Sequence, residues 1–195
     1  MTGASAVDHF IRYYDESLDQ KTCREIIKRF DADSRQISGK VSGNAGPELD
    51  RAAKQTNELI LPDDTVWSDI KRALQQSMSV GLGNYQRDVK FLAGSDHKSL
   101  YAEPLRVKKY DIGGQFSWHI DCNSAQNHSR CLAVQWYFND VAEGGATEFE
   151  DQSTAIACRA GRLAFFPVSW TYRHRGAPPL SGPKYVCTTF IHPRF

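Results

Sequence analysis

The first third of the chain carries apolar residues at helical spacing. Four of them recur at i, i+3, i+4 and i+7 and define one face of an amphipathic helix: Cys23, Ile26, Ile27 and Phe30. Ser17 and Gln20, just before this run, have the spacing of a helical capping box. The pattern predicts an amphipathic helix that begins near these two residues.

A second apolar stripe follows after a polar segment. It contains Trp67, Ile70, Leu74 and Met78, and it fades at Gly81 and Gly83, where we expect the second helix to end. The intervening residues 31–62 are polar and contain glycines, which predicts a loop with one short strand near residues 58–61. We therefore expect residues 1–88 to form a helical N-terminal support.

From about Val89 onward the hydrophobic period changes from 3.6 to 2. Short runs rich in β-branched and aromatic residues predict strands at residues 105–110, 116–121, 131–139, 147–149, 154–158, 163–166, 171–175 and 184–191. Eight short strands fit a jelly roll. We expect a single domain over residues 1–195, of the mainly β, α+β class, with a double-stranded β-helix at 89–195 and the N-terminal helices packed on one sheet.

The strand predicted at residues 131–139 has two different faces. One face is bulky and apolar, with Leu132, Val134, Trp136 and Phe138, and the other is small or polar, with Cys131, Ala133, Gln135 and Tyr137. A second face of this kind either looks at solvent or lines a polar pocket, and periodicity alone does not separate the two.

Composition and charge narrow the class of partner. The chain has 41% hydrophobic and 24% charged residues, as a globular protein does, and its formal net charge of +1 gives no electrostatic reason to expect a nucleic-acid or membrane-surface partner. Its five cysteines are odd in number and form no CxxC motif, which favours reduced thiols and a cytoplasmic location. Residues 1–9 lack the features of an export signal, and we expect no membrane insertion.

A candidate metal motif lies in the strand predicted at residues 116–121. His119 and Asp121 are two residues apart, so on a strand their side chains point to the same side and can bind one metal ion. Such a triplet also arises by chance in a chain with six histidines, and a surface pair is the alternative. A third ligand is needed to decide.

His174 is the candidate third ligand because it lies in a predicted inner strand before a Pro- and Gly-rich turn. A symmetric turn near Pro179 places His174 opposite Lys184, and cross-strand partners share a face. An inward lysine beside an inward histidine is costly in a dry core, and a metal with an anionic ligand removes that cost. Two imidazoles and one carboxylate occupy one face of an octahedral Fe(II), which leaves three positions for an oxoacid and dioxygen.

Residues 110–191 carry several further motifs at family-specific spacing. Tyr110, Gly113 and Phe116 precede the His-x-Asp motif, residues 137–149 read YFNDVAEGGATEF, residues 161–166 read GRLAFF, and ten residues separate the third candidate ligand from the lysine. In these motifs the sequence is similar to the prolyl-4-hydroxylase-like branch of the 2-oxoglutarate/Fe(II) oxygenases.

The resemblance implies a role for each matching residue. The iron ligands, which are also the catalytic residues, would be His119, Asp121 and His174; Lys184 would bind the distal carboxylate of 2-oxoglutarate, and Tyr110, Tyr137 and Thr147 would complete the co-substrate pocket, with Gln135 and Thr188 lining the same cavity. It also implies Fe(II), 2-oxoglutarate and dioxygen as cofactor and co-substrates, ascorbate as a reductant, and succinate and carbon dioxide as co-products.

Three functions follow from these expectations. The first is hydroxylation of a C–H bond, of a prolyl or related residue in a peptide or protein; the second is hydroxylation of a free amino acid or other small metabolite. A jelly-roll binding module without oxygenase activity is the alternative of another class, and Lys184 argues against it because such a module has no need for an inward cation. Arg173 and Arg175 point away from the metal by strand parity, and they either pair with acidic residues or bind an anionic substrate.

Overall fold

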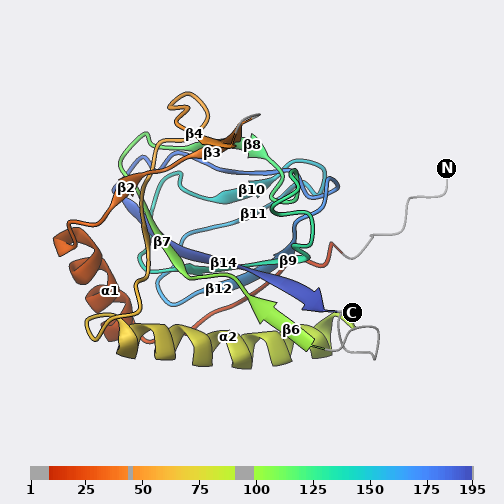
Figure 1. The fold of residues 1–195 in the computed structure, drawn as a ribbon, viewed down its shortest axis with the longest axis horizontal. Coiled ribbons are helices and arrows are strands. Elements are labelled where there is room, and N and C mark those ends of the chain that lie inside the picture. The colour runs from red at the N-terminus through yellow and green to blue at the C-terminus, as the bar shows by residue number, and fades with distance from the viewer. Residues whose placement is uncertain (1–8, 44–45, 91–98, 195) are drawn as a thin grey trace.

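Two antiparallel sheets face each other, and two helices cover the outer side of the larger sheet (Figure 1). The computed structural model describes residues 9–43, 46–90 and 99–194. The layer order is helices, larger sheet, smaller sheet. One hydrophobic core lies between the helices and the larger sheet, and a smaller one lies between the two sheets. This arrangement confirms the predicted double-stranded β-helix with N-terminal helices on one sheet.

The larger sheet contains eight strands, three of them from the N-terminal part of the chain. They are β1 (Arg12–Tyr14), β2 (Ile37–Ser38), β5 (Asn57–Ile60), β6 (Ser99–Ala102), β7 (Arg106–Tyr110), β9 (Leu132–Tyr137), β12 (Leu163–Pro167) and β14 (Lys184–Arg194). Their order is β1-β12-β9-β14-β7-β5-β2, and β6 also pairs with β14. The long strand β14 therefore pairs with three other strands of this sheet, β6, β7 and β9.

The smaller sheet has the order β11-β10-β13-β8. Its strands are β8 (Phe116–His119), β10 (Thr147–Phe149), β11 (Thr154–Ile156) and β13 (His174–Gly176). A separate two-stranded antiparallel sheet consists of β3 (Val41–Gly43) and β4 (Gly46–Glu48). The strand predicted at residues 171–175 is wrong in its bounds, because residues 171–173 form a turn and an irregular segment before β13.

The helices α1 (Gln20–Ala32) and α2 (Ser68–Asp88) use the predicted apolar stripes. Ile26 and Phe30 of α1 and Leu74 and Tyr85 of α2 are fully buried against the larger sheet. The capping box is wrong: the N-cap residue is Asp19, whose carboxylate accepts a hydrogen bond from the Thr22 backbone amide at 2.8 Å.

The second helix is longer than the sequence predicts. It continues through both glycines to Asp88, because the glycine that faces the sheet is a packing site and not a helix stop. A Cβ atom at Gly81 would lie 2.6 Å from Leu163 Cδ2 and 2.9 Å from the Phe165 ring, whereas Gly83 has nothing within 4 Å. The close approach of α2 to β12 therefore depends on the missing side chain at one of the two glycines.

Strand β9 separates the two cores, and this resolves the ambiguity of its second face. Trp136 packs toward the helices, where its Nε1 donates a hydrogen bond to Ser77 Oγ at 3.0 Å. Tyr137 and Gln135 point between the sheets and are 0% and 9% exposed. The polar face therefore lines an interior pocket rather than solvent.

The predicted helical support of residues 1–88 is incomplete. The described part of this segment also contributes β1 to one edge of the larger sheet, through pairing with β12, and β5 and β2 to the other edge, through pairing of β5 with β7. These strands have two to four residues, too few for an alternation of period 2 to stand out. Residues 1–8, most of the segment that lacks the features of an export signal, lie outside the described residues. Within the described residues, no helix is long and apolar enough to cross a membrane.

Candidate metal centre and the cavity beside it

Three potential metal ligands meet on the smaller sheet. His119 ends β8, Asp121 follows two residues later, and His174 begins β13, where it is the cross-strand partner of His119. One ligand atom from each of the three side chains lies within 4.8 Å of the other two. The structure thus brings together the three residues that the sequence singles out.

Two backbone carbonyls orient the imidazoles. His119 Nδ1 lies 2.7 Å from the Ser117 carbonyl oxygen, and His174 Nδ1 lies 3.0 Å from the Tyr172 carbonyl oxygen. Because a carbonyl oxygen only accepts, each Nδ1 carries a proton, and Nε2 is the nitrogen that faces Asp121. The two Nε2 atoms lie 3.5 and 3.3 Å from the carboxylate oxygens of Asp121.

The protonation states of His119 and Asp121 favour the binding of a metal cation. Burial, together with the charge of His174, lowers the pKa of His119, so that its neutral form is favoured. Burial alone raises the pKa of Asp121, but the two neighbouring histidines outweigh it and hold that pKa well below its usual range. A carboxylate anion beside nitrogen ligands is a donor set that Fe(II) accepts.

A buried lysine faces the same interior. Lys184, at the start of β14, is 1% exposed, and its Nζ lies 4.8 Å from the centre of the Tyr110 ring and 5.8 Å from that of Tyr137. It forms no ion pair with any described residue, and burial lowers its pKa. An uncompensated cation in such a place calls for an anionic ligand.

The predicted cross-strand pairing of His174 with Lys184 is wrong. Lys184 pairs with Tyr110 in the larger sheet, and His174 pairs with Phe149 and His119 in the smaller sheet. The two residues nevertheless line one cavity, because the inner faces of the two sheets oppose each other. The shared interior was predicted correctly from an incorrect register.

Three of the remaining predicted pocket residues form a hydrogen-bonded group. Tyr137 Oη donates to Thr147 Oγ1 at 2.7 Å, and Gln135 Nε2 donates to the same oxygen at 2.9 Å. Tyr110, Gln135, Thr147 and Thr188 line the cavity, whereas Tyr137 does not line it and contacts a lining residue through its hydrogen bond to Thr147. Thr188 Oγ1 is buried without a hydrogen-bond partner, and a ligand in the cavity would satisfy it.

The inner cavity opens toward a larger groove. The cavity measures about 20 Å³, enough for about one water molecule, so a dicarboxylate must move the lining side chains apart. The groove measures about 600 Å³, and both spaces are lined by Lys108, Phe116, His119, Asp121 and Phe190. The candidate metal ligands therefore lie at the junction of the two spaces.

The two arginines that flank His174 form ion pairs, and one further cation lines the site. Arg173 pairs with Glu150 at 2.5 Å and Arg175 with Glu148 at 2.6 Å, as the ion-pair interpretation predicts. Lys108, which lines both the groove and the inner cavity, was not singled out. The sequence indicates its position, because a residue two before Tyr110 on the same strand points to the same side.

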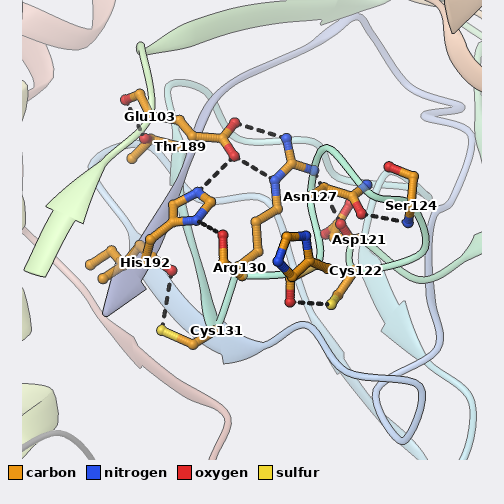
Figure 2. Close-up of polar contacts among 12 residues, drawn as sticks. Glu103, Asp121, Cys122, Ser124, Asn127, Arg130, Cys131, Thr189 and His192 are labelled. Carbon is orange, nitrogen blue, oxygen red and sulfur yellow. Dashed lines mark hydrogen bonds and ion pairs between the residues drawn. The ribbon is translucent and has the colours of Figure 1, made fainter. Parts of the chain in front are cut away.

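A polar network supports the loop that follows the His-x-Asp motif (Figure 2). The Arg130 guanidinium donates two hydrogen bonds to the Glu103 carboxylate, at 2.6 and 2.8 Å, and one to the Asp121 carbonyl oxygen at 3.1 Å. His192 contacts the same carboxylate through Nε2 at 2.9 Å and Ser129 Oγ through Nδ1 at 2.9 Å. This network ties the backbone of a candidate ligand to strand β14.

Comparison with known proteins agrees with this geometry. Residues 105–192 match the family model described as the 2OG-Fe(II) oxygenase superfamily. Prolyl 4-hydroxylase subunit alpha-2 of Gallus gallus is 27% identical over 95% of this chain and 34% of its own length, and subunit alpha-1 of the same organism is 29% identical over 48% of this chain and 21% of its own length. A prolyl hydroxylase from Trichoplax adhaerens, solved with a hypoxia inducible factor oxygen degradation domain peptide fragment, has a TM-score of 0.76 at 14% identity and covers 95% of this chain and 84% of its own.

The fold is the double-stranded β-helix, and both the ligand geometry and the match over residues 105–192 agree with the 2OG-Fe(II) oxygenase pattern. Over residues 105–192 the chain is thus similar to the 2OG-Fe(II) oxygenase superfamily, and the relatives it matches are named as prolyl 4-hydroxylase subunits. This superfamily uses Fe(II), 2-oxoglutarate and dioxygen. The chain spans about a fifth to a third of the length of the curated relatives it matches.

Proposed function

We propose that the protein is an Fe(II)- and 2-oxoglutarate-dependent dioxygenase that hydroxylates a C–H bond of a prolyl or related residue in a peptide or protein. The observation that carries this proposal is the unpaired, buried Lys184 in the cavity that also contains His119, Asp121 and His174. A metal site alone fits many proteins, whereas a metal site that shares an interior cavity with a fully buried cation lacking a counter-ion fits an anionic co-substrate.

The three ligand residues would hold Fe(II). Each histidine offers Nε2 while its Nδ1–H remains hydrogen-bonded to a backbone carbonyl, so the rings need not turn when the ion binds. Asp121 offers a carboxylate oxygen and reduces the charge of the ion. When bound, Fe(II) together with 2-oxoglutarate supplies the activation of dioxygen, with succinate and carbon dioxide as co-products.

The cavity residues would bind 2-oxoglutarate. Lys184 would pair with the distal carboxylate, with the Tyr110 ring beside the ammonium group. Thr147 and the unpartnered Thr188 hydroxyl provide further hydrogen-bonding groups on the same walls, and Tyr137 would act through its hydrogen bond to Thr147. The residues fit the co-substrate because one of them is a buried cation without a counter-ion and another is an orphaned hydroxyl.

Aromatic residues around the candidate ligands would exclude water. The ring centres of Phe149 and Phe166 lie 5.7 and 5.0 Å from that of His174, and Phe116 stacks on His119 at 3.6 Å. A dry surrounding strengthens the electrostatic contacts of the ligands and limits side reactions. The protein's own part is thus to hold three ligands, to neutralise one carboxylate and to position a C–H bond.

The substrate class rests on the relatives. The curated relatives are named as prolyl 4-hydroxylase subunits, and the Trichoplax structure contains a peptide, so a prolyl residue in a peptide is the substrate that we propose. Hydroxylation of a free amino acid is the second candidate. We also propose ascorbate as reductant, by analogy with the branch, and a cytoplasmic location, which the odd cysteine number favours.

The proposal is tested by succinate release. The wild-type protein with Fe(II), 2-oxoglutarate and dioxygen should form succinate even without a substrate, and Lys184→Met should reduce this by at least about a hundredfold while Fe(II) binding remains within about twofold. Lys109→Met, a neighbour of Tyr110 that pairs with Asp31, is the matched control. Normal succinate release by Lys184→Met would remove the proposed co-substrate pocket.

A further inference from the structure

Three cations that line the groove surround one carboxylate buried behind them. Glu58 is 1% exposed, and its carboxylate lies 2.7 Å from Lys54 Nζ and 2.9 Å from Arg106 Nη1. Lys108, on the strand next to Glu58, is the third cation, and its Cα is the cross-strand partner of the glutamate. Three positive charges against one negative charge leave an excess of two on this wall.

The partners of these cations differ in a way that points to Lys108. Lys54 is held by Glu58, by the Lys40 carbonyl oxygen and by the Phe116 ring, and Arg106 is held by Glu58. The ammonium group of Lys108 forms no hydrogen bond or ion pair with any described residue. Burial, reinforced by the Lys54 ammonium group, lowers its pKa to about 8, which marks a cation short of compensating charge.

Strand parity places Lys108 between the two spaces. Arg106, Lys108 and Tyr110 alternate on the inner face of β7. Tyr110 lines only the inner cavity, Arg106 lines only the groove, and Lys108 lines both. The unpartnered ammonium group therefore stands where a substrate in the groove would approach the candidate metal ligands.

The rest of the groove suits an amphipathic ligand. Its walls include the half-exposed Ile37 and Ile60 together with Trp118 and Phe190, and another groove cation, Arg130, is already paired with Glu103. A ligand that presents apolar groups to these walls and one anionic group to Lys108 matches both features. A carboxylate accepts charge-assisted hydrogen bonds from an ammonium group and a guanidinium group side by side.

We infer that Lys108, with Arg106 beside it, forms a subsite for a carboxylate carried by the substrate close to the hydroxylated carbon. This inference rests on the proposed function, since it assigns the groove to the substrate of that reaction. The carboxylate comes from an acidic side chain next to the target residue in a peptide or from a free amino acid. Lys108 is a specificity-determining residue here, distinct from Lys184, which lies opposite Tyr110 at the inner end of the cavity.

The test measures binding without turnover, so that it does not depend on the reaction. Two probe pairs are titrated anaerobically into the protein loaded with Fe(II) and 2-oxoglutarate, and heats of binding are recorded. One pair is acetyl-Ala-Asp-Pro-Ala-amide and its Asn counterpart; the other is L-proline and L-prolinamide. The carboxylate member of one pair should bind at least about tenfold more tightly than its amide, and the responding pair identifies the source of the carboxylate.

Variants then assign the preference to one residue. Lys108→Met should reduce the preference to less than about twofold, Lys108→Arg should keep most of it, and Lys109→Met, on the opposite face of the same strand, should leave it unchanged. Equal binding within both pairs, or a preference that survives in Lys108→Met, overturns the inference. So does a tenfold loss of 2-oxoglutarate affinity in Lys108→Met, which would place this lysine in the co-substrate pocket. Absence of succinate from the wild type in air overturns the proposed function separately.

Discussion

Arg130 Nη1 donates a hydrogen bond to the backbone carbonyl oxygen of Asp121 at 3.1 Å, and the same guanidinium is clamped by Glu103 (Figure 2). Nine residues separate the two positions, so the contact closes the loop that follows the His-x-Asp motif. Asn127 strengthens that loop because its side-chain oxygen accepts from the amides of Asn123 and Ser124 at 2.8 and 2.7 Å. The orientation of one candidate iron ligand therefore depends on a residue that is not itself a ligand.

Loss of this contact should weaken metal binding. We expect Arg130→Met to lower Fe(II) affinity about tenfold, because the neutral side chain leaves the Asp121 backbone carbonyl without its hydrogen bond. Anaerobic titration with Fe(II) measures this, and thermal unfolding of the metal-free protein shows whether the variant still folds. Arg159→Met, at an exposed arginine near Asp15, is the control. An unchanged Fe(II) affinity in Arg130→Met would show that the loop holds the ligand without the arginine.

Glu58 should make the stability of the protein depend on acid pH. Burial raises the pKa of Glu58, but Lys108 and Lys54 outweigh it and hold the pKa at about 2, below the ordinary value of 4.5. Because the folded-state pKa is the lower one, the stabilisation is complete above pH 4.5 and is lost as the pH falls from 4.5 toward 2. The shift corresponds to about 3 kcal/mol at neutral pH.

Urea unfolding of Glu58→Gln at several pH values measures this effect. The variant should lose about 3 kcal/mol of unfolding free energy at pH 7 and show a flatter decline in acid than the wild type. Glu143→Gln, at an exposed position, should keep the wild-type pH profile. Parallel acid profiles for the wild type and Glu58→Gln would contradict the assigned role of the cation cluster.

The two glycines of α2 should respond in opposite directions to substitution by alanine. Gly81→Ala introduces a methyl group into the contact with Leu163 and Phe165 and should cost about 1–3 kcal/mol of unfolding free energy. Gly83→Ala meets open space in the same helix and should stabilise the protein by about 0.5–1 kcal/mol. Denaturant unfolding of the two variants checks both signs, and equal effects would mean that α2 can shift away from β12.

The sequence predicted the chemistry better than the connections. Strand parity predicts that His119 and Asp121 share a side, and the two side chains do meet although β8 ends at His119; their neighbourhood with His174 follows from family spacing. Strand parity does not tell which sheet a strand joins. The prediction therefore pairs His174 with Lys184 in one hairpin, whereas the two residues lie in strands of different sheets. A turn that contains Pro and Gly looks the same whether its strands pair or separate.

Other errors have similarly physical causes. The sequence offers both Ser17 and Asp19 as N-cap residues of α1. Asp19 is the N-cap because its carboxylate accepts hydrogen bonds from both the amide and the hydroxyl of Thr22, at 2.8 and 2.6 Å. Gly81 looked like a helix stop because glycine has low helix propensity, but tertiary packing against the sheet overrides that preference. Lys108 was missed because a lysine on a strand is ordinarily solvated, and only the positions of both cavities show otherwise.

The most direct test of the central claim is anaerobic mixing of the protein with Fe(II) and 2-oxoglutarate, followed by admission of oxygen. The account predicts a visible metal-to-ligand charge-transfer band in the wild type, loss of that band in His174→Ala and in Lys184→Met at low 2-oxoglutarate, and succinate release when oxygen enters. Absence of the band and of succinate in the wild type, with intact folding, would contradict the assignment of this site to an Fe(II)- and 2-oxoglutarate-dependent oxygenase.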